Sequence, residues 1–373
     1  MSEQERPART GGEPRRRSED LDSFANARAT FRGLFGYELH ATQGTRRGDA
    51  IEPGDGNPGD DRADHLTVSY PSRHGDAAAV RTELLDIACT LIAHGEDVRV
   101  SRHHVHWHGS DGVVLELLPS WEDRATTSDA GGPEAGGSDA RVSSPTFDDL
   151  DLARVHWTRF YGEDRGVPEP SPFATWVAGQ LSDSLRTVIE LGCGNGRDTA
   201  AVAQGRGALG LDYSPTAIEH NRAVWAATGL EFEQVDVGDA ASLAAATAGR
   251  FDDGPVAVYS RFFIHAISDD AEAVLLRFLR RSLPSGSVVY LEFRTEKDKN
   301  TPKVFGEHYR RFVDPGALIR RMRRGGHFTV LHDERGHGLA VYKDEDPYVA
   351  RLVLQKRSPW TARVVRSRRR DTA

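Results

Sequence analysis

The residues with the clearest chemical potential begin in one glycine-rich turn. The run ELGCGNGRD over residues 190–198 follows a short apolar stretch and opens a segment of helical periodicity. Its glycines, Gly192, Gly194 and Gly196, permit a tight turn and let a ligand approach the backbone closely. Every doubly wound α/β fold has such a turn, so the glycines alone are weak evidence for a particular ligand.

Acids at the ends of three predicted strands narrow the choice of ligand. Glu190 lies just before the glycines, where it would repel a pyrophosphate but not a cationic amino-acid ligand. Asp212 ends the next strand, 22 residues after Glu190, and a carboxylate there can accept both hydroxyls of a ribose. Asp236 ends the third strand, within reach of an adenine amine. These acids predict a nucleoside ligand that carries a cationic amino-acid part.

This set of motifs resembles the class I S-adenosylmethionine-dependent methyltransferases. The resemblance rests on ELGCGNGRDT, LDYSPTAI, FEQVDVGDA, VAVYSRFFIHAI and VVYLEFRTE, and it covers roughly residues 155–357. It implies a methyltransferase of the EC 2.1.1 class with S-adenosyl-L-methionine as its cofactor. It also implies that the glycines pass under the methionine part of the cofactor, Glu190 orients that region and Asp212 holds the ribose.

The resemblance implies further contacts around the adenine and over the cofactor. Asp236 and the backbone of Val237 would face the adenine; Asp239 either shares that role or caps the following helix. Tyr161 and Phe173, in the lead-in segment, would cover the cofactor or else pack an N-terminal helix on the sheet. The expected cofactor contacts are Tyr161, Phe173, Glu190, Gly192, Gly194, Gly196, Asp212, Asp236, Val237 and Arg261.

The methyl acceptor should lie at the carboxyl ends of the fourth and fifth strands. Methyltransferases of base amines often carry Asn/Asp-Pro-Pro and an aromatic residue after the fourth strand, and this chain does not, so methylation of DNA adenine or a similar amine is disfavoured. His265 is the best candidate for a general base, with packing at a helix start as the alternative. Arg261 could instead bind an anionic or polyhydroxylated substrate, or pair with a local acid.

Basic and aromatic residues alternate beyond the fifth strand. Arginine binds phosphate through a fork of donors and aromatic rings stack on sugars, so residues 305–312 suit a phosphorylated or sugar-rich acceptor. A solvated helix face is the alternative. This region resembles methyltransferases of capsule and glycan biosynthesis clusters, with a mycofactocin-type oligosaccharide as one acceptor on that analogy. The expected catalytic and acceptor contacts are His265, Glu292, Arg294, His308 and Arg311.

Two alternative functions remain open on the residues alone. One is methylation of a small natural product or a tRNA. The other is a non-catalytic binder that uses the S-adenosylmethionine-binding fold as a scaffold, although such a scaffold need not retain the cofactor contacts Glu190, Gly194 and Asp212. The expected partner is a small-molecule or oligosaccharide acceptor rather than a nucleic acid, and the oligomeric state is not predicted.

The elements that must position these residues alternate between strands and helices. Strands are expected at 187–191, 208–211, 230–235, 255–260 and 287–293, with helices between them. This order predicts an α/β fold: a doubly wound, mostly parallel, Rossmann-like sheet. Two final strands, 327–333 and 350–356, lack a helix between them and should add an antiparallel strand at the sheet edge.

The chain divides by composition into five segments. Residues 1–60 are expected to be mostly disordered and 64–122 to form a small α+β module of order β-α-β-β-β. Residues 123–146 have the composition of a flexible linker, 147–358 form the methyltransferase domain, and 359–373 are a basic tail.

One histidine-rich strand could hold a metal. His104, His106 and His108 alternate, so they project from one face of a strand, and three histidines on one face can bind zinc. No acid or cysteine is patterned with them along the sequence, so the prediction is a half-exposed strand and no metal.

Composition excludes other classes of protein. Lys and Arg total 48 and Asp and Glu 56 in 373 residues, a net charge of −8 that argues against a chain-wide nucleic-acid binder. No apolar run reaches 18 residues, and the N-terminal residues lack the apolar core of a secretory signal. Two cysteines cannot build a disulfide framework. A cytoplasmic location is the expectation.

Overall fold

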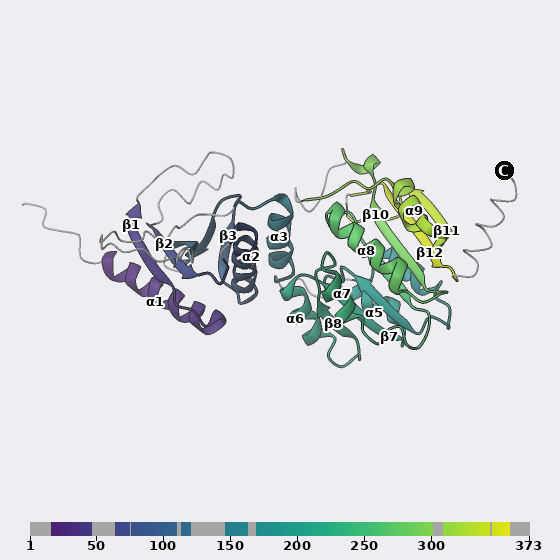
Figure 1. The fold of residues 1–373 in the computed structure, drawn as a ribbon, viewed down its shortest axis with the longest axis horizontal. Coiled ribbons are helices and arrows are strands. Elements are labelled where there is room, and N and C mark those ends of the chain that lie inside the picture. Colours follow the sequence, from purple (N-terminus) through teal and green to yellow (C-terminus); the bar gives the residue numbers. More distant parts are fainter. Residues whose placement is uncertain are drawn as a thin grey trace, which may run out of the picture. The chain divides into compact units, whose positions relative to one another are not determined.

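The computed structural model describes residues 16–46, 64–74, 76–109, 113–120, 146–162, 169–300, 309–343 and 345–358. The chain divides into two compact units, Met1–Asp148 and Asp149–Ala373 (Figure 1). Within the described ranges, no helix is long and apolar enough to cross a membrane.

The N-terminal unit is built on one five-stranded sheet of order β1-β2-β5-β4-β3. Strands β2 and β5 pair in parallel, and the other neighbours pair antiparallel. The elements are α1 (Arg16–Phe35), β1 (His40–Arg46), β2 (Asp64–Pro71), α2 (Ala77–Ala93), β3 (Asp97–Val100), β4 (Val105–His108) and β5 (Val113–Ser120).

The element order from β2 to β5 agrees with the β-α-β-β-β pattern expected from the sequence. Asp76 caps α2 by accepting hydrogen bonds from the N–H groups of Ala78 and Ala79. In β4, Val105 and Trp107 are buried, whereas the histidines between and after them are only half-buried. Period-two alternation therefore places the apolar side chains on one face of the strand.

The expected start of this unit at residue 64 differs from the structure. Strand β1 pairs antiparallel with β2, and Phe31 of α1 is fully buried with its ring 5.9 Å from that of Tyr70. The sequence of β1, HATQGTR, shows no apolar alternation. Because β1 joins the sheet through backbone pairing, no apolar pattern in its sequence predicts the strand. The predictions for residues 1–15, 47–63, 121–145 and 359–373 lie outside the described residues.

The C-terminal unit contains a seven-stranded sheet of order β11-β12-β10-β9-β6-β7-β8. Its strands are β6 (Thr187–Leu191), β7 (Gly207–Asp212), β8 (Glu231–Gln234), β9 (Ala257–Arg261), β10 (Val288–Arg294), β11 (Phe328–Gly336) and β12 (Val349–Lys356). Its helices are α3 (Asp149–Gly162), α4 (Pro172–Ala178), α5 (Arg197–Ala203), α6 (Pro215–Val224), α7 (Ala240–Ala246), α8 (Asp269–Ser282) and α9 (Pro315–Arg323), with 3₁₀ turns at Glu296–Asp298 and Arg324–Gly326.

Strands β6 to β10 pair in parallel, which confirms the predicted α/β fold with a mostly parallel sheet. One cluster of buried side chains joins the sheet to α7, α8 and α9, and a second joins it to α4 and α5. Helices therefore cover both faces of the sheet.

The last two strands pair antiparallel at the sheet edge, as the sequence analysis expected. Strand β12 lies between β10 and β11 and runs antiparallel to both, and β11 is the edge strand. Nearly every side chain of β12 is buried, as suits a strand covered on both faces, whereas most side chains of β11 are not.

A buried aspartate ties together the elements below the glycine turn. Asp198 of α5 accepts hydrogen bonds from the N–H and the hydroxyl of Ser171, at 2.8 and 2.7 Å, and from the Tyr259 hydroxyl at 2.8 Å. Ser171 also caps α4. A buried carboxylate is tolerated when hydrogen bonds compensate its lost hydration. Through these bonds Asp198 links α5 to the start of α4 and to β9.

We expect Asp198→Asn to lower the free energy of unfolding by about 3 kcal/mol, because an amide has one acceptor oxygen for three donors. Urea unfolding followed by tryptophan fluorescence measures the change. The exposed Asp253→Asn is the matched control. Equal, small effects for both variants would contradict this role of Asp198.

Candidate cofactor and acceptor site

The candidate site lies where the strand order reverses. From β6 the chain continues to β7 on one side, while β9 lies on the other. In open α/β sheets, ligands bind at the carboxyl ends of the strands at this switch point. Glu190 and Asp212, at the carboxyl ends of β6 and β7, lie on either side of the glycine turn.

The turn after β6 has a backbone that only glycine adopts readily. Gly192, Gly194 and Gly196 have φ values of +73°, +50° and +73°. The N–H groups of Gly192 and Cys193 donate to the Leu211 carbonyl at 2.8 and 3.0 Å, which anchors the turn to β7. A Cβ atom on Gly192 would overlap Phe263, and one on Gly194 would overlap Tyr161. The glycines are therefore required by close packing as well as by conformation.

Asp212 braces the same turn from β7. Its carboxylate accepts from the N–H groups of Gly194 and Ser214, both at 2.9 Å. Asn221 of α6 donates to the Gly194 carbonyl at 2.7 Å. Sequence analysis did not select Asn221, because nothing in its spacing indicates that α6 packs under the turn.

The electrostatics of the turn suit a cationic ligand. Glu190 is buried and accepts a hydrogen bond from the Thr199 hydroxyl. Burial, together with the nearby Asp198 carboxylate, raises the pKa of Glu190 well above its ordinary value. Burial also raises the pKa of Asp212, although the N–H groups of Ser214 and Gly194 oppose this. A sulfonium or ammonium group nearby would offset the cost of these buried carboxylates.

The two aromatic residues expected over the cofactor have different positions. Tyr161 of α3 lies against Gly194 and stacks on Trp157, with ring centroids 5.9 Å apart. Burial, and then the Asp212 carboxylate, raise the pKa of the Tyr161 phenol, so it stays neutral. Phe173 is fully buried between Trp176 and Tyr259 in the core. Its predicted contact with the cofactor is wrong, because the ring has no exposed surface.

The two candidate adenine contacts that follow β8, Asp236 and Asp239, have different hydrogen-bond partners. Asp239 caps α7 by accepting from the Ala241 N–H at 2.9 Å, which accounts for its position. Asp236 is exposed and accepts from the Gly238 N–H at 2.8 Å, and Val237 is buried. Asp236 therefore stays a prediction for the adenine, with the capping role assigned to Asp239.

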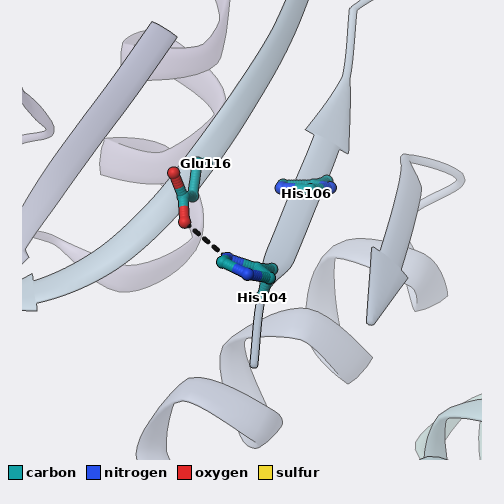
Figure 2. A group of neighbouring side chains, drawn as sticks. All are labelled: His104, His106 and Glu116. Carbon is teal, nitrogen blue, oxygen red and sulfur yellow. Dashed lines mark hydrogen bonds and ion pairs between the residues drawn. The ribbon is translucent and has the colours of Figure 1, made fainter. Parts of the chain in front are cut away.

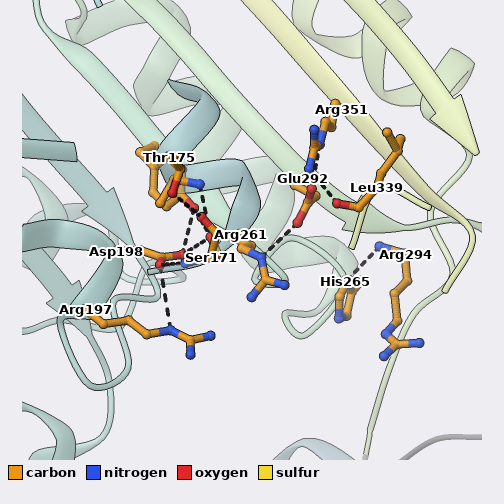
Figure 3. A network of polar contacts seen from close by, with 12 residues as sticks. Ser171, Thr175, Arg197, Asp198, Arg261, His265, Glu292, Arg294, Leu339 and Arg351 are labelled. Carbon is orange, nitrogen blue, oxygen red and sulfur yellow. Dashed lines mark hydrogen bonds and ion pairs between the residues drawn. The ribbon is translucent and has the colours of Figure 1, made fainter. Parts of the chain in front are cut away.

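Glu292 lies in a buried network with two arginines at the exits of β9 and β10 (Figure 3). It accepts from Nε of Arg261 at 2.8 Å and from Nε of Arg351 at 2.7 Å. Its side chain has no exposed surface, so direct contact with an acceptor, as expected from the sequence, is wrong. Burial alone would lower the pKa of Arg261, but Glu292, Tyr259 and Asp198 together outweigh burial and leave that pKa raised.

Arg294 is also part of the scaffold. Its guanidinium pairs with Asp298 at 2.7 Å and with Glu345, and all three side chains are buried. The expected contact with an acceptor is therefore replaced by internal ion pairs that fix the loop after β10.

His265 cannot serve as the predicted base through Nε2. Its Nδ1 accepts a hydrogen bond from the backbone N–H of Arg294 at 3.2 Å. In a neutral imidazole whose Nδ1 is the acceptor, the proton is on Nε2, so Nε2 is a donor. The side chain is also buried. The sequence predicted His265 at the exit of β9, but the tautomer of His265 depends on a hydrogen bond from the backbone of β10.

The remaining acceptor candidates lie on the segment after β10. Arg311 donates to the Ile264 carbonyl and to the Glu272 carboxylate, both at 2.8 Å, and pairs with Asp269. These contacts fix this segment against α8, and the acceptor contact of Arg311 stays a prediction. His308 lies outside the described residues.

Sequence analysis missed one residue at this exit, Phe262. It has φ of +54°, which is rare for a bulky side chain and indicates local strain. Its half-buried ring contacts the guanidinium groups of Arg261 and Arg294, whose Cζ atoms lie 4.2 and 5.2 Å from the ring centroid. No sequence signal indicates a left-handed phenylalanine, because the conformation is imposed by β9, β10 and the loop between them.

Comparison with known proteins identifies the class of this unit. Residues 182–305 match the family model described as a methyltransferase domain. The match spans β6 to β10, together with the glycine turn and the acidic strand ends. Residues 182–305 are therefore similar to a methyltransferase domain, and the cofactor is S-adenosyl-L-methionine.

Solved structures with a similar fold include an S-adenosylmethionine-dependent methyltransferase from Anabaena variabilis, 18% identical with a TM-score of 0.45. That match covers 57% of this chain and 97% of the other. A glycopeptide N-methyltransferase, MtfA, complexed with S-adenosyl-L-homocysteine is 14% identical with a TM-score of 0.40. Here 51% of this chain and 90% of the other are covered.

We expect the affinity for S-adenosylmethionine to rise with pH through the raised pKa of Glu190. Below that pKa the carboxyl is neutral; above it the carboxylate attracts the cationic ligand, so binding releases protons. Calorimetry between about pH 5.0 and 6.5 keeps the ligand's amine more than about nine-tenths protonated. Repeating the titration in buffers of different ionisation enthalpy counts the protons.

Glu190→Gln removes the titrating group and keeps an acceptor oxygen for Thr199. This variant should bind more weakly and with a smaller pH slope, the remainder coming from Asp212. An identical slope in wild type and variant would show that Glu190 does not titrate with binding.

Proposed function

We propose that the domain transfers the methyl group of S-adenosylmethionine to a hydroxyl of a sugar or oligosaccharide. The observation that carries the proposal is the pairing of Arg261 with Phe262 at the exit of β9. Only Nε of Arg261 bonds to Glu292, and neither terminal nitrogen has a hydrogen-bond partner among the described residues. In Figure 3 these nitrogens point away from Glu292. Arg261 therefore presents a fork of donors beside an aromatic ring.

This combination suits a polyhydroxylated or phosphorylated acceptor. A guanidinium fork binds two oxygens of a phosphate, carboxylate or diol, and a half-exposed ring packs on the apolar face of a sugar. The ion pair with Glu292 keeps Arg261 in one orientation, since Arg351 holds the other carboxylate oxygen at 2.7 Å. The acceptor would then meet a rigid surface, which favours alignment of its hydroxyl.

The residues of the glycine turn fit the cofactor, and we propose their roles accordingly. When bound, S-adenosylmethionine supplies an electrophilic methyl group on a sulfonium. Glu190 and Asp212 would stabilise its cationic and ribose parts, and Gly194 would allow its close approach to the backbone. Tyr161, neutral and over the turn, would cover it.

The proposal is tested by incubating the full-length protein with S-adenosylmethionine labelled in the methyl group and separate acceptor pools. The pools are neutral oligosaccharides, sugar phosphates, small aromatic natural products and tRNA. We expect label in a sugar pool, as an ether that resists mild base. Label only in natural products or tRNA would replace the proposed acceptor. Cofactor binding without transfer to any pool would favour a binding scaffold.

Arg261→Lys separates acceptor binding from cofactor binding. Lysine keeps a charge beside Glu292 but lacks the fork, so kcat/KM for the sugar acceptor should fall about tenfold, or ~1.4 kcal/mol. The calorimetric Kd for S-adenosylmethionine should change less than about threefold. Arg277→Lys on the exposed side of α8 is the control. A matching loss of cofactor affinity would instead make Arg261 a cofactor contact.

A further inference from the structure

We propose that His104, His106 and Glu116 of the N-terminal unit form a binding site for a divalent transition-metal ion of the zinc class. The three side chains come from β5 and from the start of β4 (Figure 2). One ligand atom of each lies within 4.8 Å of the others. The inference is independent of the proposed methyl acceptor, because it rests on the N-terminal sheet alone.

The sheet register creates this group. His106 is the direct cross-strand partner of Glu116 in the antiparallel β4–β5 pair. His104 precedes His106 by two residues and therefore projects from the same face. The two imidazoles stack, with centroids 5.5 Å apart and planes inclined by 20°. Strand β5 and the segment 104–108 thus hold three ligands of two types, imidazole and carboxylate, close together.

The distances are close to those that one ion requires. Zinc binds imidazole nitrogen at about 2.0–2.1 Å, so tetrahedral ligands lie roughly 3.4 Å apart. His104 Nδ1 and Glu116 Oε1 are already 2.7 Å apart. Changes in side-chain rotamers would bring the third ligand in, since His104 and Glu116 are partly exposed, with 47% and 24% of their side chains accessible.

The donor set selects the class of metal. Two imidazoles and one carboxylate suit zinc, cobalt or nickel, whereas magnesium and calcium prefer oxygen ligands alone. Three protein ligands at a partly exposed position leave at least one coordination position for water or an anionic ligand. Such a site would give the N-terminal unit a ligand-binding role of its own.

Among the described residues, Arg99 places an opposing charge beside the site. Arg99 of β3 is the cross-strand partner of His106, and it pairs with Asp97 at 3.4 Å. That ion pair reduces the repulsion between the guanidinium and a bound cation. His108, the third histidine of the row, does not belong to the group: its ring lies 6.4 Å from that of His106 in an edge-on arrangement.

The proposal is tested on the full-length chain without a histidine tag, after treatment with a chelator. Titration with Co²⁺ is followed by visible absorption, and Zn²⁺ is then added as a competitor. We expect one equivalent of Co²⁺ with a low-coordinate spectrum, displaced by Zn²⁺. His106→Ala and Glu116→Gln should each weaken binding at least about tenfold. His104→Gln, at the most exposed ligand, is a third variant that preserves the fold.

His94→Ala is the matched control, since His94 is an exposed histidine of the same unit whose Nδ1 contacts the Thr90 carbonyl. It should bind Co²⁺ as the wild type does. Zinc should also raise the melting temperature of the wild type and of His94→Ala but not of His106→Ala. No stoichiometric Co²⁺ binding, or equal binding by His106→Ala and wild type, would overturn the proposal and leave His104 and Glu116 as an ion pair.

Discussion

Three carboxylates buried around one glycine turn are the constraint on which the C-terminal unit depends. Burying a charge costs several kcal/mol unless partners replace its hydration. Asp198 has three donors, and Asp212 has two backbone N–H groups. Glu190 has the Thr199 hydroxyl, and its pKa is raised most clearly. The unit therefore combines a well-compensated acid that holds the fold with a poorly compensated one where we propose that the cationic cofactor binds.

At the exits of β9 and β10, the partners of each charged side chain likewise distinguish residues that hold the fold from residues that could bind an acceptor. Glu292 pairs with Arg261, Arg294 pairs with Asp298, and Arg311 pairs with Glu272, so these charges are used within the fold. Arg261 differs, because its pairing through Nε leaves its two terminal nitrogens directed away from Glu292. Its neighbour Phe262 is held in a strained conformation between two arginines. Strain of this kind is retained where the surrounding structure enforces it.

The N-terminal unit shows the same dependence on pairing between strands. Along the sequence, the histidines before and within β4 have no acidic partner, and they indicate only a half-exposed strand. The antiparallel register with β5 supplies Glu116 opposite His106. Strand β1 is a comparable case, since it enters the sheet by backbone pairing with β2 without an apolar pattern of its own. The register depends on both strands together, so it cannot be predicted from the sequence of either strand alone.

The amino-acid sequence by itself determined the strand and helix order of the methyltransferase domain, the position of the glycine turn and the acids that flank it. These are local features: apolar period, the φ freedom of glycine, and charges at strand ends are set within a few residues. Only the tertiary structure decided that the Phe173 ring is buried in the core and that His265 Nδ1 accepts a hydrogen bond. It also decided that Arg311 binds the Ile264 carbonyl and that β12 lies between β10 and β11. Each of these depends on a partner distant in sequence, because burial and hydrogen-bond direction arise only when separate elements pack together.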